Sequence, residues 1–233
     1  MAVLLAIDSS TDSLAIALTG PGGASVFEGA GGPKASELVV PEAMALLRAA
    51  GLQLADVDAI AFGRGPGAFT GLRTACSVAQ GLAFGADKPV LAIDSLMLVA
   101  EDARLQAGGS IDGAIWVAMD ARMDEIYAAQ YRFEHGRWTV LDAPALYAPA
   151  ALIAHWGQPG AVAGSALRVF AQLGDFERSW PEAASRARAL ASLAEQAFNE
   201  EGALLDAAEA QPLYVRDKVA STTAERLAIG AKA

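Results

Sequence analysis

The chain contains very few of the residues that build disulfides and metal centres. It has one cysteine and two histidines, so no internal disulfide can form, which suits the cytoplasm. His135 and His155 each stand without a second ligand at helical spacing, so no metal site is predicted and both are expected at the surface or in turns. Cys76 falls on the apolar face of a predicted helix, where a buried thiol is usually inert.

Long apolar runs and an excess of positive charge are missing as well. No apolar run reaches the roughly 18 residues that span a bilayer, and Met1 leads straight into a strand-like run, so neither a membrane span nor a signal peptide is predicted. Lysine and arginine number 17 against 27 acidic residues, a net charge of -10. Nucleic-acid binders usually carry a basic face. If this chain acts on RNA, we expect a partner to hold the RNA.

What remains is a packed globular chain of 233 residues, 54% of them hydrophobic, which is enough for one large domain or two small ones. Residues 212–216 are predicted to be extended, and the tail from Ser221 is expected to fray. Apolar runs predict strands, and helical spacing predicts helices. The strands are expected over 3–7, 14–18, 25–28, 57–62, 89–93, 114–119, 125–133, 138–141 and 161–164, and the helices over 36–50, 71–85, 95–106, 149–156 and 181–201.

The order of these elements restarts after residues 108–110. Two copies of such an α/β unit are the pattern of the actin-like, sugar-kinase and Hsp70-type (ASKHA) fold, a duplicated ribonuclease-H-like fold with two lobes facing a cleft. We therefore divide the chain into a first lobe, 1–107, and a second lobe with the C-terminal tail, 108–233. In that fold the turn after the first strand of each lobe approaches phosphate, and Asp8 and Asp120 occupy these two matching places.

The first of these turns has two interpretations. Its hydroxyls and amides could hold a phosphate, and Asp8 could hold a magnesium ion through water. The alternative is an Asx-type turn with no ligand, and the residues alone do not separate the two. The turn consists of Asp8, Ser9, Ser10 and Thr11.

The second turn is a poorer phosphate loop. Asp120 is followed by bulky residues where a close backbone approach needs small ones. Arg122 is expected to form a local ion network with Asp120, Asp124 and Glu125. A complete ATPase site is therefore not predicted.

A glycine-rich stretch between a predicted strand and a predicted helix also has two interpretations. Free amides and the positive end of a helix, with an arginine on each side, favour an anion or partner site. Close backbone packing at a tight corner is the other interpretation, and the residues favour it. Thr70 is a plausible N-cap for the helix. The stretch contains Gly63, Arg64, Gly65, Pro66 and Gly67, followed by Thr70 and Arg73.

Two helices of the first lobe are apolar nearly all the way round. An apolar stripe alone would face the core, whereas apolar residues on most sides indicate burial on two sides or an interface. Small residues such as Gly71 and Gly81 would let another helix come close. An interface is therefore favoured over plain core. The predicted contact residues are Leu38, Val40, Met44, Leu47, Ala75, Val78, Ala79 and Leu82.

Four motifs, in order over nearly the whole chain, resemble those of the TsaB (YeaZ-type) family of bacterial tRNA threonylcarbamoyladenosine synthesis. The residues around Asp8 resemble the family opening, and the glycine-rich stretch resembles its highly specific central motif. The other two motifs are the second-lobe hairpin and the closing motif. The motifs span residues 6–11, 63–73, 119–127 and 212–216.

The resemblance implies a scaffold that is similar in fold to the catalytic subunit TsaD but lacks its metal-binding histidines. Such a chain would pair with TsaD through the first-lobe helices and make it competent. TsaD, with TsaB and the ATPase TsaE, transfers threonylcarbamoyl to adenosine 37 of tRNA, so tRNA would be met only through the complex. TsaB-like proteins also pair with themselves through the same surface. Residues 34–39 contain no histidine pair of the TsaD kind.

Two other functions remain as alternatives. A stand-alone ATPase or small-molecule kinase of this fold would use Asp8 and Asp120. A glycopeptidase is disfavoured because metal and nucleophile sets are missing. We expect no catalytic residue and no cofactor of the chain's own. ATP and magnesium binding stays open, either weak in this groove or at the junction with a partner.

Overall fold

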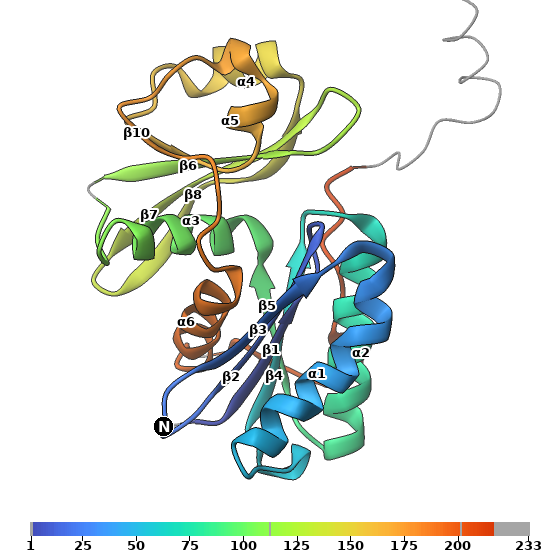
Figure 1. Ribbon diagram of the computed structural model, residues 1–233. Coiled ribbons are helices and arrows are strands. Elements are labelled where there is room, and N and C mark those ends of the chain that lie inside the picture. The colour runs from blue at the N-terminus through green and yellow to red at the C-terminus, as the bar shows by residue number, and fades with distance from the viewer. Residues whose placement is uncertain (1, 112, 201, 217–233) are drawn as a thin grey trace, which may run out of the picture.

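The computed structural model describes residues 2–111, 113–200 and 202–216, which form two β-sheets with helices on and between them (Figure 1). The first sheet has six strands in the order β11-β5-β4-β1-β2-β3, and the second has five in the order β10-β9-β6-β7-β8. The tail from Ser221, predicted to fray, lies outside the described residues.

The elements follow one another in two series. The first is β1 (Leu4–Asp8), β2 (Ser13–Thr19), β3 (Ser25–Ala30), α1 (Ala35–Ala49), β4 (Ala59–Gly65), α2 (Phe69–Ala86), β5 (Val90–Asp94) and α3 (Ser95–Gln106). The second is β6 (Ala114–Asp120), β7 (Ile126–Glu134), β8 (Arg137–Tyr147), α4 (Pro149–Trp156), β9 (Ala161–Ala163), α5 (Ala166–Val169), β10 (Arg178–Trp180) and α6 (Arg186–Phe198). A short strand, β11 (Leu204–Leu205), and a 3-10 turn, η4 (Ala207–Glu209), follow α6, and further 3-10 turns lie at Gly32–Lys34, Leu54–Asp56 and Ala171–Leu173.

The two series repeat one topology. In the first, β1, β2 and β3 are antiparallel neighbours, β4 lies parallel to β1, and β5 lies parallel to β4. In the second, β6, β7 and β8 are antiparallel neighbours, β9 lies parallel to β6, and β10 lies parallel to β9. The predicted repeat of element order is confirmed. The short elements β10 and α5, which the sequence pattern did not indicate, complete the second copy.

The first sheet is covered on both faces, which explains its continuous apolar strands. Leu5 and Ile7 of β1 pack toward α1 and α2, whereas Leu4 and Ala6 pack toward α6. Figure 1 shows α1 and α2 on one side of this sheet, α6 on the other, and α3 between the two sheets. Alternate residues of β1 therefore enter two separate cores, and the whole strand is buried.

The C-terminal segment returns to the first sheet. Helix α6 packs on β1, β2 and β5 and against α3, β11 pairs with β5, and η4 packs on α2. The division of the chain between residues 107 and 108 stays a prediction for folding units. The C-terminal segment was predicted to belong to the second lobe, but in the structure it packs on the first sheet.

Several predicted helix ends differ from the structure. Ala68, with an extended backbone, is the N-cap of α2, so Thr70 lies inside the first turn and the predicted cap is wrong. Helix α1 begins at Ala35, one residue before its predicted start. Helix α6 begins only at Arg186, because Ser185 provides the N-cap and accepts from Arg188 N.

Candidate functional site

Asp8, the last residue of β1, lies at the centre of a buried polar cluster. Its Oδ1 accepts hydrogen bonds from Arg186 Nη2 at 2.8 Å and from Ser10 Oγ at 2.9 Å, and its Oδ2 accepts one from Ser95 Oγ at 3.1 Å. Both Asp8 and Arg186 are buried. A buried carboxylate needs a cation and donors to offset its lost hydration. In this cluster the chain itself supplies both.

The turn that follows is organised by its own side chains. Ser10 N donates to Asp8 Oδ1 at 3.3 Å, which is the Asx-turn pattern. Ser9 Oγ donates to Gly71 O at 2.7 Å, and Thr11 Oγ1 accepts from the backbone two residues on. The geometry is therefore that of the ligand-free alternative. Phosphate or magnesium binding at this turn stays a prediction, and the carboxylate concerned is already paired with a guanidinium.

The glycine-rich loop after β4 packs directly on this turn. A Cβ atom at Gly63 would lie 1.8 Å from Asp8 Oδ2, and one at Gly71 would lie 1.8 Å from Ser9 O. At Gly67 the nearest atom, a backbone oxygen of the same turn, would be 2.3 Å away. No side chain fits into these spaces. The close approaches support the tight-corner interpretation of the loop.

The same loop joins distant parts of the chain. Gly65 N donates to Ser95 Oγ at 3.0 Å, and Leu213 N donates to Arg64 O at 2.7 Å. Gly65 has a φ of 116°, which few other residues adopt, and its peptide bond to Pro66 is cis. Ser95 therefore bonds both the loop and the carboxylate at the end of β1. The loop connects β4, the start of α3 and the closing motif.

Arg73 is held by the closing motif. Its Nε donates to Tyr214 Oη at 3.1 Å, and its guanidinium carbon lies 4.0 Å from the centroid of the Phe69 ring. The Phe69 and Tyr214 rings are 5.1 Å apart between centroids. The side chain of Arg73 thus fixes residues near 214 to the first turns of α2.

A second buried carboxylate connects the two lobes. Asp94 ends β5, caps α3 by accepting from Leu96 N at 2.9 Å, and accepts from Tyr131 Oη of β7 at 2.8 Å. Burial raises the pKa of Asp94, against the opposing effects of these hydrogen bonds and the charge of Arg64. Burial and the nearby Asp94 raise the pKa of Tyr131, so its hydroxyl keeps its proton and donates.

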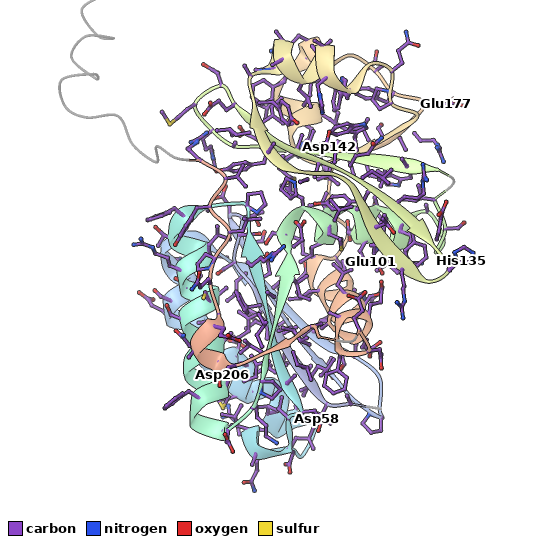
Figure 2. The ribbon with its side chains drawn as sticks, turned by 180° about the vertical axis from the view of Figure 1, so that it is seen from behind. Asp58, Glu101, His135, Asp142, Glu177 and Asp206 are labelled. Carbon is purple, nitrogen blue, oxygen red and sulfur yellow. The ribbon has the colours of Figure 1, made fainter. Side chains whose placement is uncertain are left out.

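The interior of the lobe junction holds a third acid. Glu101 of α3 is fully buried and lies between the lobes (Figure 2). It accepts from Arg104 Nε at 2.7 Å, Trp138 Nε1 at 2.8 Å and Ser192 Oγ at 2.5 Å. These donors come from α3, β8 and α6. Hydrogen bonds from β8 and α6 to this one side chain of α3 therefore hold the lobes together at their junction.

The second-lobe turn does not form the predicted ion network. Asp120 ends β6 as Asp8 ends β1, and its Oδ1 accepts from Arg122 N at 2.9 Å. The Arg122 guanidinium, however, pairs with Asp12 of the first lobe at 2.7 Å, and Glu125 pairs with Arg216 at 2.6 Å. The prediction is wrong because Arg122 and Glu125 form their ion pairs with residues outside the turn.

The histidines and the cysteine lie as predicted. His135 is exposed in the turn between β7 and β8, and exposed His155 contacts Asp142, which Figure 2 labels. Cys76 is buried, and burial raises the pKa of its thiol. Within residues 2–111, 113–200 and 202–216, no three His, Cys, Asp or Glu side chains gather to hold a metal. Over the same ranges, no helix is both long and apolar enough to cross a membrane.

The predicted partner residues divide into three groups by exposure. Leu47, Ala75 and Ala79 are at most 1% exposed and belong to the core between the helices and the first sheet. They cannot reach a partner, so these three predictions are corrected to core positions. Val40 is 39% exposed. The partly buried members are Leu38, Met44, Val78 and Leu82.

The outer side of α2 carries an exposed aromatic side chain that the predicted contact set missed. Phe84 is 79% exposed. Gly81 and Gly85 lie in the helix, and a Cβ at either position would meet nothing within 4 Å. The run of apolar residues through Phe84 was the available signal, but helical spacing alone did not tell the outer side from the core side.

Comparison with known proteins gives a consistent result. Residues 33–230 match the family model of TsaD, the tRNA N6-adenosine threonylcarbamoyltransferase. The tRNA threonylcarbamoyladenosine biosynthesis protein TsaB of Escherichia coli is 35% identical over 147 residues, 63% of this chain and 62% of that protein. The protein of the same name from Haemophilus influenzae is 41% identical over 128 residues, 54% of this chain and 52% of that protein. The chain thus aligns with less than two thirds of the length of these relatives.

A solved structure covers more of the chain. The crystal structure of an uncharacterized protein with similarity to peptidase YEAZ from Pseudomonas aeruginosa superposes with a TM-score of 0.82 and 34% identity. The match covers 93% of this chain and 100% of that one. Together with the repeated topology of the two sheets, it confirms the predicted two-lobed, actin-like fold.

Proposed function

The chain belongs to the TsaB (YeaZ-type) family, and from this premise we propose that it serves in the synthesis of threonylcarbamoyladenosine in tRNA as a non-catalytic subunit. Its role is to bind and activate TsaD, which transfers threonylcarbamoyl to adenosine 37. The complex with TsaD and TsaE binds the tRNA, and the reaction takes place in the cytoplasm. The acidic chain, with its net charge of -10, leaves RNA contact to its partners.

The observation that carries this proposal is the outer side of α1 and α2. Glycine inside a helix costs about 1 kcal/mol relative to alanine, and nothing within the chain occupies the space above Gly81 or Gly85. Internal packing therefore gives no reason for either glycine, whereas an approaching helix does. Exposed Phe84 and Val40 supply apolar contact on the same pair of helices.

The hydrogen bonds around Asp8 support a non-catalytic role. Asp8, the residue that would hold magnesium, is paired with Arg186 and bonded to two serine hydroxyls. Breaking a buried ion pair costs several kcal/mol, so a metal ion would bind here only at that cost. We therefore expect any nucleotide to bind at the junction with the partner and not at the turn that carries Asp8.

The test is association with purified TsaD from the same organism, followed by light scattering. Val40→Asp and Phe84→Asp should each weaken the heterodimer, because they place a charge in an apolar contact. Val169→Asp, on α5 of the second lobe, is the matched control, since Val169 is 56% exposed and lies away from α1 and α2. Binding as tight in both first-lobe variants as in the control would refute this surface.

Catalysis by the chain alone needs a separate measurement. The proposal expects no ATP hydrolysis by the isolated protein with magnesium. Turnover that disappears in Asp8→Ala, while a folded protein remains, would instead favour the ATPase alternative.

A further inference from the structure

The first sheet has a free edge at β3. This strand is last in the sheet order and pairs with β2, and among the described residues no strand pairs with its other side. An edge strand presents unpaired N–H and C=O groups, which proteins usually protect with charged side chains (lysine above all), with proline or with a bulge. Residues 25–30, Ser-Val-Phe-Glu-Gly-Ala, contain neither lysine nor proline, and their pairing with β2 runs without a bulge. Their one charged side chain, Glu28, is negative and so would repel an acidic strand but not a basic one.

A groove of about 580 Å³ adjoins this edge. One wall is β3, with Val26, and the other is the C-terminal end of α3, with Leu105. These two side chains are 36% and 39% exposed. The groove therefore offers an apolar position beside a row of unpaired backbone groups.

The groove is fixed by two carboxylates that reach one loop from opposite walls. Glu28 of β3 accepts from Ser185 Oγ at 2.8 Å and from Ala187 N at 2.9 Å. Asp102 of α3 accepts from Ala184 N at 2.9 Å and from Ser185 N at 2.8 Å. Both walls are thus tied to the residues that begin α6. A preformed groove lowers the ordering cost of binding.

We propose that β3 and this groove bind an extended, basic segment of a partner protein, which joins the first sheet as an additional strand. In this mode, backbone hydrogen bonds to the edge provide affinity, and alternate side chains enter adjoining pockets and provide specificity. An apolar side chain of the segment lies between Val26 and Leu105. Its neighbours, which point to the opposite face, remain free to carry charge.

Charge selects the occupant. The groove is lined by the two carboxylates Glu28 and Asp102 against one arginine, Arg188, and the whole chain carries a net charge of -10. A basic segment is therefore drawn toward the edge, and a second copy of the same acidic chain is repelled. This surface is separate from that of the proposed function. The groove is lined by Ser185 and Arg188 at the start of α6, and Figure 1 shows α6 on one side of the first sheet and α1 and α2 on the other.

The test uses the full chain and labelled peptides. Fluorescein-labelled Lys-Val-Lys-Val-Lys-Val should bind, as measured by fluorescence anisotropy. Two matched peptides should bind at least tenfold more weakly: Glu-Val-Glu-Val-Glu-Val, of opposite charge, and Lys-Val-Lys-Pro-Lys-Val, which keeps the three lysines while proline removes a backbone donor. Hydrogen exchange should slow at the amides of β3 on addition of the first peptide and stay unchanged at β8, the corresponding edge of the second sheet.

Variants distinguish binding at β3 from non-specific electrostatic attraction of the peptide to the acidic chain. Val26→Lys and Val140→Lys add the same charge to exposed valines, of 36% and 46% exposure, on the two edge strands β3 and β8. Val26→Lys should weaken peptide binding at least tenfold and Val140→Lys should not, and Leu105→Lys on α3 should repeat the effect of Val26→Lys. Equal effects of Val26→Lys and Val140→Lys, equal binding of the three peptides, or exchange protection confined to other elements would each overturn the proposal.

Discussion

The Arg186–Asp8 pair allows a quantitative prediction for Arg186→Met. The side chains are 8% and 0% exposed, so the variant leaves a buried carboxylate without its cation while methionine fills most of the volume. Removing one partner of a buried ion pair typically costs about 3–5 kcal/mol. For a chain of this size, about 2–4 °C of melting temperature is lost per kcal/mol. We therefore expect the midpoint to fall by roughly 6–20 °C.

Calorimetry and urea denaturation of the isolated protein measure this effect. The double variant Asp8→Asn with Arg186→Met should regain part of the loss, because the neutral amide leaves no uncompensated charge. Arg168→Met is the matched control, since its pair with Glu182 is 58% and 69% exposed, and it should shift stability by at most about 0.5 kcal/mol. A stable Arg186→Met protein without any rescue in the double variant would refute the reasoning and would leave Asp8 available to a ligand.

Two further predictions concern the outer helix and the lobe junction. Gly81→Ala and Gly85→Ala should each raise the free energy of unfolding by about 1 kcal/mol, because alanine favours the helix and open space surrounds both positions, yet both should weaken binding to TsaD. Burial raises the pKa of Asp94. The carboxyl therefore binds its proton more tightly in the folded state, and stability falls as the pH rises from about 3.9, its ordinary value, through the raised folded pKa. Asp94→Asn should flatten this part of the stability curve, measured by urea denaturation at successive pH values. A curve unchanged in slope would contradict the assignment.

Local pattern predicted those parts of the fold whose cause is local. The helix over 95–106 was predicted with its observed bounds, because apolar spacing acts within a few positions. The strand over 3–7 followed from its apolar run. Short elements such as β10, with three residues, carry too little pattern to be predicted from a single sequence.

Local pattern failed where a residue's partner lies far along the chain. Arg186 is separated from Asp8 by 178 positions, so nothing around either residue showed that the carboxylate would be neutralised. Arg122 was assigned to its own turn for the same reason. In the apolar helices α1 and α2, the sequence pattern also did not show which side faces the core. Leu47 faces the sheet and Phe84 faces solvent, and only the packed structure distinguishes them.

The amino-acid order by itself determined the repeated series of strands and helices, the acidic and cysteine-poor character of the chain, and the motifs that place it in its family. These properties depend on neighbouring residues and on composition. Tertiary structure alone decided that Arg186 pairs with Asp8, that α6 and β11 return to the first sheet, and which apolar side chains remain on the surface. Those outcomes depend on contacts between distant segments, whose energies no local stretch of sequence contains.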